Sequence, residues 1–259
     1  MNNISALAFD LDGTVYKGNQ AIKGALDTIA TLTDLNYKIF YFTNNSAKTR
    51  QQIVDKLNRL GFPANLQNTY CTSYAILIYL LEKKLKSIYL IGSPDLRNEL
   101  LAHKIKIKES CQVSAVVVGL DTVFNYSKIQ IALEAIDKGA KLIIANLDGS
   151  YPIENNKRLP GCAAMVGAIV GATAHEPDFS VGKPNTYMLD LLCKDHKLGP
   201  AKICIVGDSP ESDIKLASNL KCPSILFDPA NKFPKFFGNK IKRLQEIILL
   251  INKIKRLSR

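Results

Sequence analysis

Two aspartates, Asp10 and Asp12, end the first apolar run of the chain, in the stretch FDLDGTVYKG. In an extended strand, residues two positions apart point to the same side and lie about 6.6 Å from each other. Two carboxylates placed in this way repel each other, and they lose hydration if they face a cleft. Proteins tolerate such a pair beside a cation, or where one carboxylate is a nucleophile and the other a general acid and base. Asp10 and Asp12 are therefore the first candidates for chemistry.

A second pair of carboxylates, Asp208 and Asp213, follows a later apolar run, in the stretch GDSPESD. Carboxylate and water oxygens around a cation favour Mg²⁺ over Zn²⁺. The sequence therefore predicts a magnesium site, with Mg²⁺ as the cofactor.

Two further stretches carry groups that suit a phosphate. FTNNS offers a hydroxyl, side-chain amides and backbone N–H groups ahead of a predicted helix, and a helix N-terminus with such a loop binds anions. In VGKPN, Lys183 precedes Pro184, whose ring restricts the backbone of the residue before it. A lysine held in this way can contact both a nucleophilic carboxylate and a phosphoryl oxygen.

The elements that must position these residues alternate between short runs rich in β-branched residues and amphipathic stretches. This order predicts an α/β fold with right-handed crossovers and a mostly parallel, doubly wound sheet covered by helices on both faces. The predicted strands are 6–9, 38–42, 87–92, 115–120, 141–146, 202–207 and 224–227. The predicted helices are 25–35, 48–60, 96–103, 128–138 and 186–195.

The candidate residues follow three of these strands. Asp10 follows strand 6–9, Thr43 follows strand 38–42, and Asp208 follows strand 202–207. Because open α/β sheets bind ligands beyond the carboxyl ends of their strands, we expect these side chains to share one site. The strands between 87 and 146 have fewer charged groups at their ends, and the sequence leaves open whether they extend the same sheet or form a separate insert.

Length and composition fit one large domain or two ordinary ones. The chain has 259 residues, of which 47% are hydrophobic. No apolar run is long enough to cross a bilayer, so we expect no membrane partner. The first residues lack the basic segment and long apolar stretch of a signal peptide, and the six cysteines form no CxxC pair. We therefore expect a cytoplasmic protein whose cysteines are reduced.

The chain is basic, with a formal net charge of +11. This charge suits nucleic acid, anionic lipid or small phosphorylated molecules, and proteins without any anionic partner also carry such charges. Much of it lies near the C-terminus, where apolar residues from Ile241 to Ile254 are spaced as one helical face. We expect a terminal helix that packs on the domain and turns its lysines to solvent.

Four stretches resemble, in order, the four motifs of the haloacid dehalogenase superfamily: DLDGTVY, TNNS, GKPN and GDSPESDI. The long segment between TNNS and GKPN resembles the branch with a large α/β cap, which groups NagD-like proteins, 4-nitrophenylphosphatases and phosphoglycolate phosphatases. Within it, ANLDGSYP and LPGCAAM resemble the end of the cap and the return to the core. The resemblance implies a Rossmann-like core of residues 1–78 and 178–259 with an inserted cap domain of residues 79–177.

The resemblance also implies roles for the candidate residues. Asp10 would attack phosphorus and form an aspartyl-phosphate, and Asp12 would protonate the leaving oxygen and then activate water. Mg²⁺ would be held by Asp10, the backbone carbonyl of Asp12 and Asp208, with Asp213 in support. The phosphoryl group would be bound by Thr43, Asn44, Asn45 and Lys183.

The cap implies a small substrate. Asn146 and Asp148 follow its last predicted strand, and the resemblance would place them against the substrate. A cap that closes over the site favours a small phosphorylated metabolite, such as a sugar phosphate, a nucleoside monophosphate or phosphoglycolate, and argues against nucleic acid. Ser212 and the stretch PGCAA depart from common patterns of the branch, but neither removes a catalytic atom. A homodimer through the cap is left open by analogy.

Two other functions stay open at this point. A phosphotransferase or phosphomutase of the same superfamily would differ only in its acceptor, a sugar hydroxyl in place of water. A non-catalytic basic protein that binds nucleic acid would account for the charge. However, its aspartates would repel phosphates without a metal, and no nucleic-acid-binding module is evident. The sequence favours a phosphoric monoester hydrolase.

Overall fold

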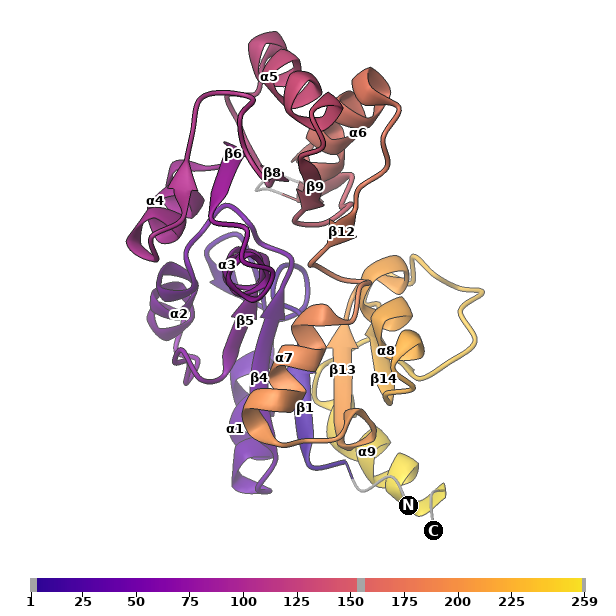
Figure 1. Cartoon of the computed structure of the whole chain (residues 1–259). Coiled ribbons are helices and arrows are strands. Elements are labelled where there is room, and N and C mark those ends of the chain that lie inside the picture. The colour runs from indigo at the N-terminus through magenta and orange to yellow at the C-terminus, as the bar shows by residue number, and fades with distance from the viewer. Residues whose placement is uncertain (1–3, 153–156, 258–259) are drawn as a thin grey trace.

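The structure, a computed structural model, describes residues 4–152 and 157–257, which build two parallel sheets, one above the other in Figure 1. The first sheet has the strand order β15-β14-β13-β1-β4-β5, and the second has the order β12-β9-β8-β6-β7. The strands of the first sheet are β1 (Ala6–Phe9), β4 (Lys38–Thr43), β5 (Thr69–Cys71), β13 (Ile203–Gly207), β14 (Ser224–Phe227) and β15 (Lys240–Ile241). Those of the second are β6 (Ser87–Ile91), β7 (Lys106–Ile107), β8 (Ala115–Val118), β9 (Lys141–Ile144) and β12 (Phe179–Ser180).

The order in which the chain adds strands to the first sheet reverses between β1 and β13. β1 pairs in parallel with β4 on one side and with β13 on the other. The chain adds β4 and β5 toward one edge, and after the second sheet it adds β13, β14 and β15 toward the other edge. Open α/β sheets bind ligands at the carboxyl ends of the strands where such a reversal occurs.

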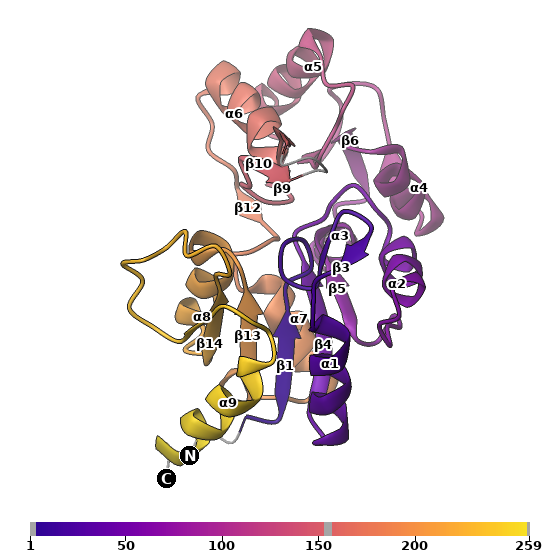
Figure 2. The same cartoon turned by 180° about the vertical axis from the view of Figure 1, so that it is seen from behind.

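Helices cover both faces of the first sheet (Figures 1 and 2). Both faces of β1 are apolar, because Ala6 and Ala8 point to one face and Leu7 and Phe9 to the other. Packed on the Leu7 side are α1 (Ala25–Asp34), α2 (Arg50–Arg59) and α9 (Glu246–Leu257). Packed on the Ala6 side are α3 (Thr72–Glu82), α7 (Tyr187–His196) and α8 (Lys215–Asn219). A strand that is buried on both faces reads as a continuous apolar run.

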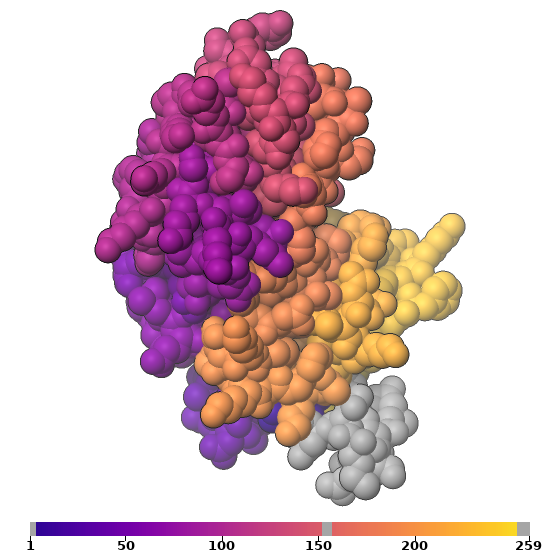
Figure 3. Space-filling model, viewed as in Figure 1, coloured from indigo at the N-terminus to yellow at the C-terminus, as the bar shows by residue number. Residues whose placement is uncertain are grey.

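The second sheet forms a separate insert above the first. Its helices are α4 (Pro94–Ala102), α5 (Tyr126–Asp137) and α6 (Cys162–Thr173). The apolar cluster on the α3 side of the first sheet continues into this insert, and the space-filling view shows the two parts in close contact (Figure 3). Two hairpins complete the described strands: β2 (Tyr16–Lys17) with β3 (Gln20–Ala21), and β10 (Ser150–Pro152) with β11 (Arg158–Pro160).

The predicted α/β fold is confirmed, and the insert resolves the question left open for strands 87–146. The second sheet includes Phe179 and Ser180, which pair with β9, so it reaches past residue 177. One expectation was wrong: Ile241 does not belong to the C-terminal helix. It lies in β15, which pairs with β14, and α9 begins only at Glu246. None of the described helices is long and apolar enough to span a membrane.

Candidate active site

Asp10, Asp208 and Asp213 come together where the first sheet reverses. Asp10 follows β1 directly, and Asp208 follows the neighbouring β13. Asp213 lies in the short π-helical turn η3 (Pro210–Ile214) beyond β13. One carboxylate oxygen of each aspartate lies within 4.8 Å of those of the other two. The structure therefore joins three of the four aspartates that were predicted to hold the metal.

Lys183 reaches this carboxylate cluster from the loop after β12. Its Nζ donates to Asp10 Oδ1 at 2.6 Å and to Asp213 Oδ1 at 2.7 Å. The side chain is only 2% exposed, so the two carboxylates replace water around the ammonium. Its backbone is fixed as well, because the Lys183 N–H donates to Asn44 Oδ1 at 2.8 Å.

Negative charge exceeds positive charge in this cluster, since three carboxylates face one ammonium. Burial raises the pKa of Asp10 well above its ordinary value, although Lys183 opposes the rise. Burial, with the nearby charge of Asp213, raises the pKa of Asp208 to about 6. Burial alone would lower the pKa of Lys183, but the charges of Asp10 and Asp213 outweigh it, and the pKa lies above its ordinary value. A divalent cation at this cluster would offset the excess charge.

Two glycines leave room for the carboxylates. Gly13 has a φ of 95°, which side-chain-bearing residues rarely adopt. A Cβ at Gly13 would lie 2.3 Å from Asp208 Oδ2, and a Cβ at Gly207 would lie 2.2 Å from Asp213 Cγ. Both distances are too short for real atoms, so only glycine lets the backbone approach the carboxylates this closely.

Asp12 stands two residues from Asp10 and has partners of its own. The Tyr16 hydroxyl donates to Asp12 Oδ2 at 3.3 Å. The Lys56 ammonium, from α2, lies 3.7 Å from the centre of the Tyr16 ring. Burial raises the pKa of Asp12, and the Lys56 charge and the Tyr16 hydrogen bond oppose this rise. A raised pKa suits a group that gives up a proton and then takes one back.

Three of the predicted phosphate-binding residues, Thr43, Asn44 and Asn45, lie at the carboxyl end of β4. Thr43 is buried at the end of this strand, and its Oγ1 accepts a hydrogen bond from the Asn45 N–H at 3.1 Å. Asn45 Oδ1 in turn accepts the N–H groups of Ala47 at 2.9 Å and Lys48 at 3.0 Å, which shapes the turn into α2. The Thr43–Asn45 loop is therefore ordered by its own side chains.

Asn44 joins this loop to the core and to the insert. Its Nδ2 donates to the Lys183 carbonyl at 3.1 Å and to the Asp148 carboxylate at 3.1 and 3.3 Å. Asn146 Nδ2 donates to the Asn44 carbonyl at 2.8 Å, and the Asp148 N–H donates to Asn146 Oδ1 at 3.0 Å. Asn44, Asn146 and Asp148 therefore meet at the junction of the two sheets, and their contact with a substrate stays a prediction.

Three neighbours of the site were not predicted. Tyr16 lies within the DLDGTVY stretch, and its spacing of four residues from Asp12 was the only signal for it. Lys56 comes from the middle of α2 and has no local signal. Thr72 Oγ1 donates to the Asn44 carbonyl at 2.8 Å, and nothing in the sequence around the first turn of α3 pointed to this contact.

The residues present fit a magnesium ion. Every donor of the cluster is a carboxylate oxygen, with no thiolate or imidazole among them, and this donor set is typical of Mg²⁺. The excess negative charge around Lys183 agrees with a divalent cation.

Two family models match the chain, one from β1 into the insert and the other after it. A model of haloacid dehalogenase-like hydrolases matches residues 7–106, and a second, HAD-hydrolase-like model matches residues 180–229. The first range includes Asp10 and Thr43, and the second includes Lys183 and Asp208.

Known proteins extend this match over nearly the whole chain. Phosphoglycolate phosphatase 1A, chloroplastic, of Arabidopsis thaliana is 32% identical, over 93% of this chain and 76% of that protein. The solved p-nitrophenyl phosphatase from Archaeoglobus fulgidus has the same fold, with a TM-score of 0.89 at 22% identity over 96% of this chain and 99% of that one. A glycerol phosphate phosphatase from Mycobacterium tuberculosis, solved in complex with magnesium, has a TM-score of 0.77 at 27% identity, over 86% of this chain and 68% of that one.

The fold and the site together define a hydrolase with a Rossmann-like core and an α/β cap. The chain belongs to the haloacid dehalogenase-like hydrolase family. The resemblance to its NagD-like branch, predicted from the four motifs, is confirmed, and so is the expectation of an enzyme.

Proposed function

We propose that the protein is a Mg²⁺-dependent phosphatase that hydrolyses small phosphate monoesters through an aspartyl-phosphate on Asp10. The observation that carries the proposal is the Lys183 ammonium, held 2.6 Å from Asp10 and 2.7 Å from Asp213. A nucleophile, a phosphoryl-binding ammonium and cation-binding oxygens therefore meet in one cluster. The relatives are named as phosphatases, which supports the same reaction class.

The reaction has two steps that use the residues of the cluster in turn. The Asp10 carboxylate attacks phosphorus, the bond to the leaving oxygen breaks, and Asp12 gives its proton to that oxygen. Asp12 then takes a proton from water, the oxygen of this water attacks phosphorus, and Asp10 is released as a carboxylate. Lys183 and the loop at Thr43, with Asn44 and Asn45, hold the phosphoryl oxygens throughout.

Mg²⁺ would be held by the carboxylates of Asp10 and Asp208 and the backbone carbonyl of Asp12, with Asp213 in support. When bound, it neutralises the charge that develops on the phosphoryl oxygens.

The position of the insert supports the expectation that the substrate is small. We assign residues 1–78 and 178–259 to the catalytic core and residues 79–177 to the cap, with β12 of the returning chain pairing with the cap sheet. The cap contacts the phosphate-binding loop through Asn146 and Asp148, at the carboxyl ends of the core strands. A cap in this position favours a small substrate such as a sugar phosphate, a nucleoside monophosphate or phosphoglycolate, and it argues against a nucleic-acid duplex. We therefore expect no nucleic-acid partner, and a homodimer through the cap is left open.

Hydrolysis of 4-nitrophenyl phosphate, measured with Mg²⁺ and with EDTA, tests the proposed function. We expect activity that depends on Mg²⁺ and disappears in Asp10→Asn. A sugar acceptor added to the same assay separates the phosphotransferase, which would form a new sugar phosphate in place of inorganic phosphate. Tight, salt-sensitive binding of DNA or RNA without any hydrolysis would instead favour the nucleic-acid-binding alternative.

A further inference from the structure

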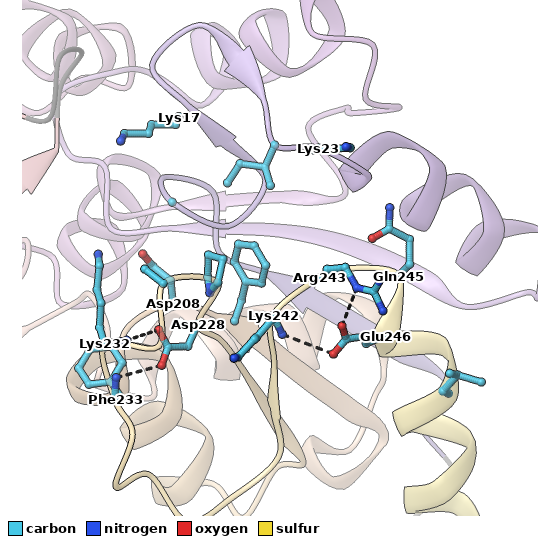
Figure 4. A pocket seen from close by; sticks show the side chains of 16 residues that line it. Lys17, Lys23, Asp208, Asp228, Lys232, Phe233, Lys242, Arg243, Gln245 and Glu246 are labelled. Carbon is cyan, nitrogen blue, oxygen red and sulfur yellow. Dashed lines mark hydrogen bonds and ion pairs between the residues drawn. The ribbon is translucent and has the colours of Figure 1, made fainter.

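A cavity of about 1020 Å³ lies beside the carboxylate cluster, on the flank of the first sheet (Figure 4). Three segments far apart in the sequence contribute most of its lining: the hairpin region 13–23, the loop after β14 at 227–233, and the stretch 242–249 that leads into α9. Gly13 and Asp208 are among the residues that line it, whereas Lys183, Thr43 and Asn44 do not line it. This flank cavity therefore borders the predicted metal site but is separate from the phosphoryl-binding residues.

One part of the lining of the flank cavity, here called the apolar floor, consists of apolar side chains. Its apolar lining consists of Ile22, Phe227, Pro229, Ala230, Phe233 and Leu249. The volume is in the range of cavities that hold small organic molecules. An occupant with an apolar body would bury surface against these side chains, which stabilises the bound state.

The rim of the flank cavity is cationic. It carries the side chains of Lys17, Lys23, Lys232, Lys242 and Arg243. In residues 4–152 and 157–257, neither the Lys232 nor the Lys242 ammonium has a hydrogen bond or ion pair with the protein. Figure 4 shows Lys232 extended alongside Asp208. These two ammonium groups are therefore available to an anion.

The acidic residues of the rim have protein partners of their own. Asp228 accepts the N–H groups of Lys232 at 2.7 Å and Phe233 at 2.9 Å, and it lies 3.8 Å from the Lys240 ammonium. Glu246 accepts the Arg243 Nε–H at 2.9 Å. Because these carboxylates are already paired, neither of them forms an ion pair with the Lys232 or Lys242 ammonium, and the nearby Asp208 acts on Lys232 only through its charge.

We propose that the flank cavity is a second binding site, for a small organic anion with an apolar body and an acidic group. The apolar floor would receive the body, and Lys232 and Lys242 would pair with the acidic group. A bare inorganic anion would leave the floor empty, and a neutral apolar molecule would leave the ammonium groups unpaired. The site does not depend on the proposed phosphatase activity, because its test is binding.

A fluorescent aryl sulfonate, 8-anilinonaphthalene-1-sulfonate, combines an aromatic body with one anionic group and is not a phosphate ester. Its binding to the full chain is measured by fluorescence titration, with Mg²⁺ and saturating inorganic phosphate present to occupy the phosphoryl-binding residues. We expect saturable binding at one site that persists under these conditions. Failure to bind, or complete displacement by phosphate and Mg²⁺, would overturn the proposal.

Three variants locate the binding. The double variant Lys232→Glu/Lys242→Glu should lower the affinity for the dye at least about tenfold, because two attractive charges become repulsive. Leu249→Asp should lower this affinity by a similar factor without disturbing the core, since Leu249 is 75% exposed. Lys235→Glu makes the same substitution once, three residues after Lys232 and outside the cavity lining, and should leave the affinity unchanged. Equal affinity in all three variants would place the dye elsewhere and contradict the assignment.

Discussion

The Lys183 ammonium lies 2.6 Å from Asp10 Oδ1, and this contact joins residues 173 positions apart in the chain. The two side chains are 2% and 11% exposed, so water screens their interaction little. The same ammonium also binds Asp213 at 2.7 Å. Lys183 therefore holds together two carboxylates that would otherwise repel each other.

Removing this ammonium should impair both catalysis and stability. In Lys183→Met, Asp10 and Asp213 lose their shared partner, and a substrate loses a contact to its phosphoryl oxygens. We expect kcat/KM for 4-nitrophenyl phosphate to fall at least about 100-fold, or about 2.7 kcal/mol, together with a lower unfolding midpoint. Lys194→Met is the matched control, because Lys194 is 76% exposed. Near-normal activity in Lys183→Met would contradict its role.

Gly13 should control the affinity for Mg²⁺ through its contact with Asp208. In Gly13→Ala, the new Cβ would overlap Asp208 Oδ2 and displace this carboxylate. We expect Mg²⁺ affinity, measured by calorimetry, to fall at least about tenfold. Gly139→Ala is a close control, since Gly139 has a φ of 90° and a Cβ added there would meet nothing within 4 Å. An equal loss of Mg²⁺ affinity in both variants would mean that backbone strain, rather than displacement of Asp208, causes the loss.

The stabilising effect of Mg²⁺ should depend on pH. The pKa of Asp208 in the folded, metal-free protein is raised from 3.8 to about 6. Protonation of Asp208 therefore favours the folded metal-free state, and this contribution is present below about pH 4 and is lost as the pH rises through about 6. Mg²⁺ needs the ionised carboxylate, so protons compete with it.

We therefore expect Mg²⁺ to raise the unfolding midpoint more at about pH 7.5 than at about pH 5. The measurement is thermal unfolding with Mg²⁺ and with EDTA at both pH values. Asp208→Asn, which cannot ionise, should lose the Mg²⁺ effect at the higher pH. An equal Mg²⁺ effect at both pH values would exclude Asp208 as the titrating ligand.

Asn146 and Asp148 should differ in their effects on substrates. The Asn146 amide holds the Asn44 carbonyl, so Asn146→Ala should loosen the phosphate-binding loop and lower kcat/KM for every ester by a similar factor. Asp148→Ala should instead change the ranking of substrates by about tenfold, or about 1.4 kcal/mol, with less effect on 4-nitrophenyl phosphate. The measurement is kcat/KM over a small panel of phosphate esters. A uniform loss in Asp148→Ala, matching that in Asn146→Ala, would remove its role in specificity.

The sequence predicted the parts of the site that are local in the chain. Asp10 and Asp208 each follow a fully buried apolar strand directly, so the parallel sheet brings them to one edge without further information. Partners that depend on the packing of helices were not predictable: Lys56 reaches Tyr16 only because α2 packs beside the β2–β3 hairpin. The flank cavity was missed for the same reason, since it forms only when segments 13–23, 227–233 and 242–249 meet.

In the fold, too, local features were predictable from the sequence and features that depend on distant partners were not. The strands of four to six residues were predicted to within a few residues, because each is largely buried and has a continuous apolar run. The two- and three-residue strands have too little pattern to recognise. Ile241 fits the helical spacing of the residues that follow, but its pairing partner in β14 is far away in sequence, and pairing places it in a strand.

Detection of a phosphoryl group on Asp10 tests the mechanism most directly. Asp12→Ala keeps the nucleophile but cannot activate water, so a substrate with a good leaving group should phosphorylate Asp10 and then stall. The full-length variant is mixed with 4-nitrophenyl phosphate and Mg²⁺, quenched in acid, digested and analysed by mass spectrometry. We predict a burst of one nitrophenol per protein and a phosphoryl adduct on Asp10, absent in the Asp10→Asn/Asp12→Ala double variant. Continued turnover in Asp12→Ala without any adduct, or an adduct on another residue, would contradict the mechanism.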